Sequence, residues 1–70
     1  MMLVRRAVFN RDGAVMNESS VRVRDRTEAL TRIFREQQAF PVSGYDEARG
    51  YYWAQPQDRE MYFHRWRIVE

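Results

Sequence analysis

The sequence predicts an α+β domain in which one helix packs on one face of an antiparallel sheet of two hairpins, in the chain order ββαββ. Three observations predict this fold. A strand-like segment runs into an Asn-Arg-Asp-Gly turn, a helical repeat with a capping signal follows, and two strand-like segments flank a proline near the end. With 70 residues and no repeat or long linker, the chain is expected to be a single small domain, residues 1–70.

The first hairpin is predicted from residues 3–10, which are rich in strand formers and lead into the turn Asn10–Gly13. Asn first, Asp third and Gly fourth are typical of a type I turn closed by a left-handed glycine. This turn places Phe9 opposite Val15 on one face, and we expect a bulge or a break at residues 17–20. On the other face Arg6 then lies across from Glu18. This face carries a more polar set: Val4, Arg6, Val8, Met16, Glu18, Arg22 and Arg24.

The helix is predicted between Asp25 and Ala39. Asp25 and Glu28 have the spacing of a capping box, and acidic residues there also complement the helix dipole. Apolar residues recur at helical spacing and define the face that packs on the sheet: Ala29, Leu30, Ile33 and Phe34. Because Pro41 disfavours helical geometry in the residue before it, the helix should end near Gln38 or Ala39.

The second hairpin is predicted within residues 50–70, after a connector over residues 41–50. Pro56 suits the second position of a type I turn that begins at Gln55 and pairs it with Glu60. One face of this hairpin is then aromatic without charge, and it carries Tyr51, Trp53, Tyr62, His64, Trp66 and Ile68. On the opposite face Tyr52 lies across from Phe63, and Arg65 and Arg67 follow on the same strand as Phe63.

The helix is expected to cover the uncharged face of this hairpin, with Trp53 and Trp66, because burying unpaired guanidinium groups costs several kcal/mol. The other face then stays open to solvent, with Glu18 as its only acid. It gathers arginines around aromatic rings, and we take its residues as candidates for binding: Arg6, Arg22, Arg24, Tyr52, Phe63, Arg65 and Arg67.

Composition narrows the class of protein. There is no cysteine for a disulfide or a thiolate metal site, and no apolar run is long enough to cross a bilayer. The first residues carry charge too early for a signal peptide, so we expect a cytoplasmic protein without a membrane partner. All 12 cationic residues are arginine, which suits planar contacts with carboxylates or phosphates.

Catalysis finds little support in the sequence. His64 is the only histidine, and its predicted position faces the core, where a structural role is expected. The glycines match neither a phosphate-binding loop nor a dinucleotide fingerprint, and no spacing of residues predicts a metal site. We therefore expect no catalytic residues, no metal, no cofactor and no enzymatic activity.

Two function classes remain. The first is a non-enzymatic protein-binding module, an adaptor, regulator or inhibitor, whose partner presents an acidic or amphipathic surface. The alternative is a single-stranded nucleic-acid-binding protein that uses the same face. Two other roles for that face stay open: a second copy of the chain covers it in a homodimer, or Tyr52 and Phe63 simply stabilise their hairpin. In size and layout the predicted domain resembles small phage-borne inhibitors of host complexes, a likeness that rests on no motif.

Overall fold

A computed structural model describes residues 2–56 and 62–70 of the chain. Over these residues the chain forms five strands and one helix: β1 (Met2–Phe9), β2 (Val15–Val23), α1 (Arg26–Gln37), β3 (Val42–Asp46), β4 (Tyr51–Gln55) and β5 (Phe63–Val69). The α+β class is therefore confirmed. The predicted order ββαββ is wrong, because an additional strand, β3, lies where a connector was expected.

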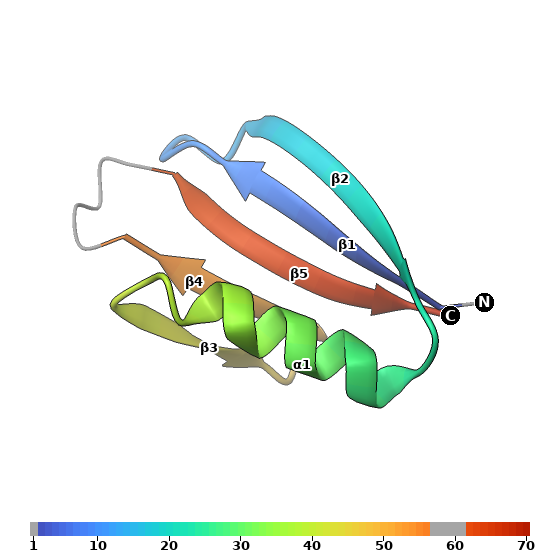
Figure 1. Cartoon of the computed structure of the whole chain (residues 1–70). Helices are drawn as coiled ribbons and strands as arrows, with labels where there is room; N and C mark the ends of the chain where they lie inside the picture. Colours follow the sequence, from blue (N-terminus) through green and yellow to red (C-terminus); the bar gives the residue numbers. More distant parts are fainter. Residues whose placement is uncertain (1, 57–61) are drawn as a thin grey trace.

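The strands form one antiparallel sheet in the order β2-β1-β5-β4-β3. The last strand of the chain lies in the centre, where β5 pairs with β1 on one side and with β4 on the other (Figure 1). The two ends of the chain consequently lie side by side, with Leu3 opposite Val69. This long-range pairing joins the first hairpin to the rest of the sheet.

The turn of the first hairpin matches the prediction. Gly13 has a φ of +86°, and the backbone N–H of Asn10 donates to the carbonyl of Ala14 at 3.0 Å. The side chain of Asn10 accepts from the N–H groups of Asp12 and Ala14, so the turn is held by its own first residue. The bulge, however, comes earlier than predicted: Phe9 faces Val15 and Val8 already faces Asn17, which leaves Met16 as the extra residue.

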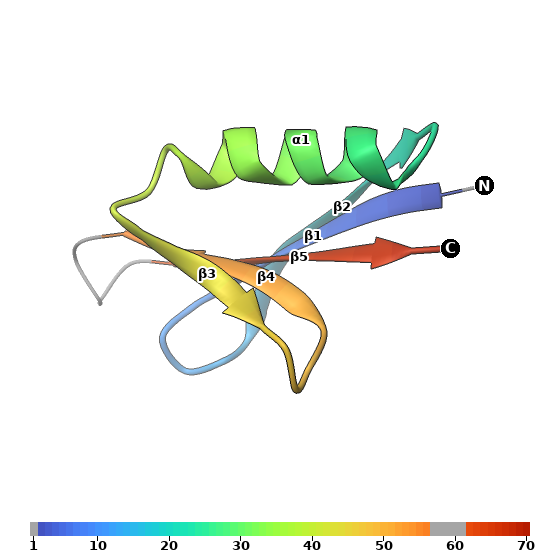
Figure 2. The same cartoon turned by 90° about the horizontal axis from the view of Figure 1, so that it is seen from below.

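Helix α1 begins and ends close to where the sequence predicts. Asp25 is the N-cap, its carboxylate accepts from the N–H of Glu28 at 2.9 Å, and Gln38 is the C-cap. The helix lies across one face of the sheet, and the opposite face carries no other element of the described chain (Figure 2). Between the helix and the sheet lies the buried core: Val4, Val23, Ala29, Ile33, Ala54 and Trp66. Phe34 is the exception in the predicted stripe, since it stays 47% exposed.

Strand β3 packs against β4 through an aromatic ring and a glycine. Gly44 lies opposite Trp53, whose ring occupies the space that a Cβ at Gly44 would need. The helix ties down the same place, because the buried side chain of Gln37 donates to the carbonyls of Gly44 and Trp53 at 3.1 and 3.0 Å. A glycine and a buried amide thus hold a segment in which Ser43, Gly44 and Asp46 are weak strand formers.

The register of β4 against β5 differs from the prediction by three residues. Tyr52 faces Trp66 instead of Phe63, and Trp53 faces Arg65 instead of Tyr62. Successive side chains of a strand point to opposite faces, so an odd shift turns every residue of β4 to the face opposite to the one expected. The predicted turn from Gln55 to Glu60 falls partly on residues 57–61, outside the described residues.

Candidate functional site

The face of the sheet away from α1 brings rings and guanidinium groups together. Cross-strand partners share a face, so the pairings of β1, β2, β4 and β5 define which side chains lie there. We call this the arginine-aromatic face, and its members are Arg5, Phe9, Arg22, Tyr51, Trp53, Phe63, Arg65 and Arg67. One acid of β2, Glu18, lies among them as the partner of Ala7.

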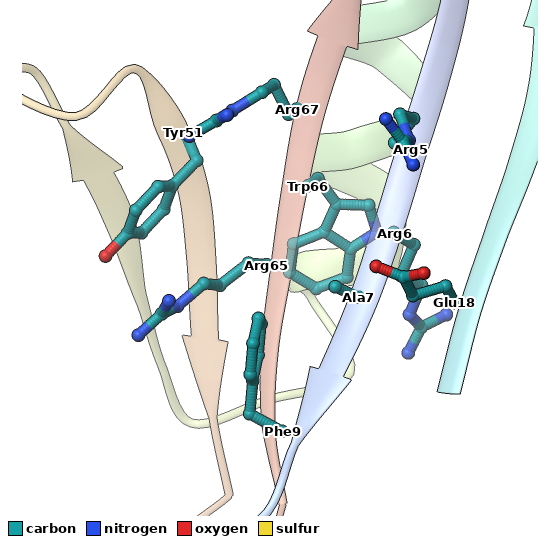
Figure 3. A pocket seen from close by; sticks show the side chains of 9 residues that line it. All are labelled: Arg5, Arg6, Ala7, Phe9, Glu18, Tyr51, Arg65, Trp66 and Arg67. Atoms are coloured by element: carbon teal, nitrogen blue, oxygen red, sulfur yellow. The ribbon is translucent and has the colours of Figure 1, made fainter. Parts of the chain in front are cut away.

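A pocket of about 240 Å³ opens on this face over Ala7, in the middle of β1. Figure 3 looks into it with α1 behind the sheet; Phe9, Arg65 and Tyr51 lie on one side, and Arg5 and Glu18 lie on the other. The small side chain of Ala7 leaves room for the pocket at a position where larger residues surround it. The side chain of Trp66 contributes to the lining from the opposite side of β5.

Arg65 is held between two aromatic rings in this pocket. The central carbon of its guanidinium lies 4.4 Å from the ring centre of Phe9 and 4.8 Å from that of Tyr51. Such contacts are each worth about 0.5–1 kcal/mol at exposed sites. The two rings therefore restrict where the guanidinium of Arg65 can lie.

Arg5 and Arg67 lie directly opposite each other on β1 and β5. Like charges in this position repel each other. Within residues 2–56 and 62–70, no carboxylate lies within 4.0 Å of a guanidinium nitrogen of these two residues or of Arg22 and Arg65. Arg67 donates to the backbone carbonyl of Arg49 at 3.2 Å. The pocket thus concentrates positive charge that the described part of the chain does not neutralise.

Tyr51 forms the wall of the pocket on the β4 side. It is only 9% exposed although it lies on the open face. Hydrogen bonding with Tyr51, then the charge of Tyr51 and that of Asp46, raise the pKa of Arg49 above its ordinary value. Asp46 also caps the β3–β4 turn, where its carboxylate accepts from the N–H of Arg49 at 3.0 Å. The wall of the pocket on this side is therefore a buried ring beside a capped turn.

Arg6 does not lie on this face, so its predicted placement is wrong. It is opposite Trp66 on the helix side, where one of its terminal nitrogens donates to Nδ1 of His64 at 2.9 Å. Its guanidinium also lies 5.1 Å from the ring of Trp66 and 3.8 Å from the carboxylate of Glu36. The prediction assumed that a guanidinium on the covered side would stay unpaired, whereas Glu36 of α1 supplies the countercharge.

Tyr52 is also on the helix side, and this placement corrects a second prediction. Its ring packs edge-on against Phe34 at 5.8 Å and tilts against Tyr45 at 4.5 Å. Trp53 takes the opposite, open side, so α1 covers Trp66 but not Trp53. Tyr52 and Phe63 accordingly do not form the expected cross-strand pair.

The remaining candidates divide into two groups. Arg22, Phe63, Arg65 and Arg67 lie on the open face, as predicted. Arg24 follows the end of β2 and pairs instead with Glu28 of the helix at 2.9 Å. Arg32, one turn further along the helix, lies 3.8 Å from Glu36.

Sequence reasoning missed four members of the arginine-aromatic face: Arg5, Phe9, Tyr51 and Trp53. Their residue types were visible, and the strict alternation along β1 and β4 placed each set together. The missing information was which of the two alternating sets faces the helix, and that depends on the bulge at Met16 and on the register of β4 against β5.

The described residues contain no cluster of three or more His, Cys, Asp or Glu side chains that could hold a metal ion. In the same part of the chain no helix has the length and apolar character needed to cross a membrane. No protein-family model matches the chain, and comparisons with curated proteins and with solved structures find no similar chain. The site is therefore interpreted from its own geometry.

Proposed function

We propose that this chain is a small non-enzymatic protein-binding module that holds an acidic segment of its partner on the arginine-aromatic face. One observation carries the proposal: Arg65 is oriented between Phe9 and Tyr51 beside the opposed Arg5 and Arg67, and no described carboxylate neutralises them. A carboxylate that enters the pocket would bind the free N–H edges of Arg65 and relieve the repulsion between the other two.

Preorganisation supports this function. A free arginine side chain loses rotamer freedom when it binds, and stacking between two rings removes part of that loss beforehand. Arginine and aromatic residues are also the types enriched at the energetic centres of protein interfaces. The partly exposed rings of Phe63 and Trp53 extend the contact beyond the pocket with apolar area.

The ring contacts favour a protein partner over single-stranded nucleic acid. A base needs a free ring face on which to stack. Tyr51 is almost fully buried and has Arg65 over its ring, and the ring of Trp53 lies against Gly44. The guanidinium edges are better suited to side-chain carboxylates along an extended segment. His64 is engaged with Arg6 on the covered side of the sheet.

The test is a titration with a fluorescent peptide that alternates glutamate with valine. We expect the double variant Arg65→Glu/Arg67→Glu to bind it at least about tenfold more weakly than the parent. The matched control, Arg26→Glu/Arg35→Glu, makes the same charge change on exposed positions of α1 and should reduce binding much less. Circular dichroism should show that all three proteins keep their fold.

Two results would contradict the proposal. Equal binding by the two double variants would mean that the peptide responds only to overall charge. Binding of oligothymidine with loss of peptide binding, together with a steep dependence on salt, would identify the nucleic-acid alternative.

A further inference from the structure

Strand β2 forms one edge of the sheet, and no strand of the described chain pairs with its outer side. Among the described strands it pairs only with β1, and every residue from Val15 to Ser20 is exposed. Figure 1 shows β2 at the rim of the sheet, with α1 lying over the strands further in. An edge of this kind presents unpaired N–H and C=O groups that another strand can bind.

The opposite edge is less available. Strand β3 has 5 residues against 9 in β2. Gln37 already donates to the carbonyl of Gly44 in the middle of β3. The longer strand has no proline, the residue that most directly blocks edge pairing. Edge pairing is therefore expected at β2.

The bulge defines how much of β2 is regular. Met16 interrupts the ladder, and the pairing with β1 is continuous from Asn17 to Val23. The central residue of that segment is Ser20. When two identical strands pair antiparallel about a two-fold axis, full overlap of this segment places Ser20 opposite Ser20 of the second copy.

The charges of β2 complement each other in the same register. Glu18 of one copy then faces Arg22 of the other, and the two-fold axis repeats the pair. Both side chains are on the arginine-aromatic face, as partners of Ala7 and Leu3, so they point to the same side of the sheet. Within the described residues neither forms an ion pair in its own chain. A shift of one residue in either direction would separate both pairs.

We propose that two copies of this chain associate through β2, antiparallel about Ser20, with Glu18 of each copy paired to Arg22 of the other. The strand length and the charge pattern lead independently to this register. The axis is perpendicular to the sheet, so both helices lie on one side and the two arginine-aromatic faces join on the other. A single pair of strands is a small interface, and the dimer is expected to be weak. This inference does not depend on the proposed function.

Charge reversal tests the pairing. We expect analytical ultracentrifugation over about a hundredfold range of concentration to show a monomer–dimer equilibrium. Glu18→Arg alone and Arg22→Glu alone should each weaken association by about tenfold or more, because each places like charges opposite each other twice. Mixing the two single variants should restore association as a heterodimer, and the double variant Glu18→Arg/Arg22→Glu should restore the homodimer.

Cysteine cross-linking tests the register. The chain has no cysteine of its own, so Ser20→Cys introduces a single thiol on the proposed axis. Directly opposed residues of antiparallel strands have Cα atoms about 4.5–5.5 Å apart, which is within reach of a disulfide. Under mild oxidation Ser20→Cys should form a covalent dimer far faster than Asn17→Cys, whose partner in this register is Val23.

Two outcomes would overturn the inference. One is a monomer at every concentration, with Ser20→Cys cross-linking no faster than Asn17→Cys. The other is a dimer that neither single charge reversal weakens, because the interface would then lie on another surface.

Discussion

Arg6 on β1 donates a hydrogen bond to Nδ1 of His64 on β5, with 2.9 Å between the two nitrogens. A guanidinium can only donate, so Nδ1 of His64 is an acceptor and the imidazole is neutral. Burial, and after it the charge of Arg6, lowers the pKa of His64 below its ordinary value of 6.5. The carboxylate of Glu36, which lies 3.8 Å from Arg6, opposes this shift.

This pair makes the stability of the domain depend on pH. The unfolded chain takes up a proton at His64 near pH 6.5, whereas the folded chain takes it up only at lower pH. The free energy of unfolding should therefore fall as the pH is lowered from about 7.5 to about 5.5. Urea unfolding at several pH values measures this slope. The variant His64→Gln keeps an acceptor near Arg6 but does not titrate, so its free energy of unfolding should depend less on pH. An unchanged slope in this variant would show that His64 does not cause the pH dependence.

The two tryptophans should differ in environment and in energetic weight. Trp66 is fully buried and its Nε1 donates to Glu36, so Trp66→Phe should lower the free energy of unfolding by about 1–3 kcal/mol. Trp53→Phe should cost less. In fluorescence, Trp53→Phe leaves only the buried ring, whose emission should be blue-shifted and protected from acrylamide. Stronger quenching of that variant than of Trp66→Phe would reverse the assignment of faces.

The contact between Gly44 and Trp53 should appear as a coupling energy. A Cβ at Gly44 would lie 2.8 Å from Cζ2 of Trp53, closer than Cβ atoms approach other atoms in proteins. Gly44→Ala should therefore destabilise the domain by about 1–2 kcal/mol, because the ring must move. In the Trp53→Ala background the same substitution should cost much less, and a double-mutant cycle measures the difference. Ser43→Ala, on the same strand and exposed, is the control; additive effects of the first two changes would contradict the contact.

Gln37 should be the helix residue that holds β3 and β4 in place. Its buried amide donates to the carbonyls of Gly44 and Trp53, and Gln37→Leu would leave both without this donor. We expect a loss of about 1–3 kcal/mol in the free energy of unfolding, measured with urea. The same change at the exposed neighbour, Gln38→Leu, should have a small effect. Similar losses in both variants would show that the hydrogen bonds of Gln37 contribute little.

Local chemistry made several elements predictable. The turn at Asn10–Gly13 needs only the side chain of its first residue and a left-handed glycine, and both are adjacent in the chain. The helix start likewise depends on Asp25 and the N–H of Glu28, three residues away. Phe63, Arg65 and Arg67 were placed on the open face correctly because β5 was predicted to bury Trp66, and it does.

Strand β3 was missed because its stability comes from distant residues. Its own sequence, with serine, glycine and aspartate, favours a connector. The ring of Trp53 fills the space beside Gly44, and Gln37 binds its carbonyl, yet neither contact is visible in the local sequence.

Residues a few positions apart specify the turn, the helix and its cap, and the alternation of rings and arginines along each strand, so these features could be predicted. Which alternating set faces the helix depends on how distant strands pair. Successive side chains of a strand point to opposite faces of the sheet. The extra residue at Met16 and the three-residue shift between β4 and β5 therefore each moved side chains to the face opposite to the predicted one. The covered position of Arg6 was decided in the same way, because its partners Glu36 and His64 are close only in the folded chain.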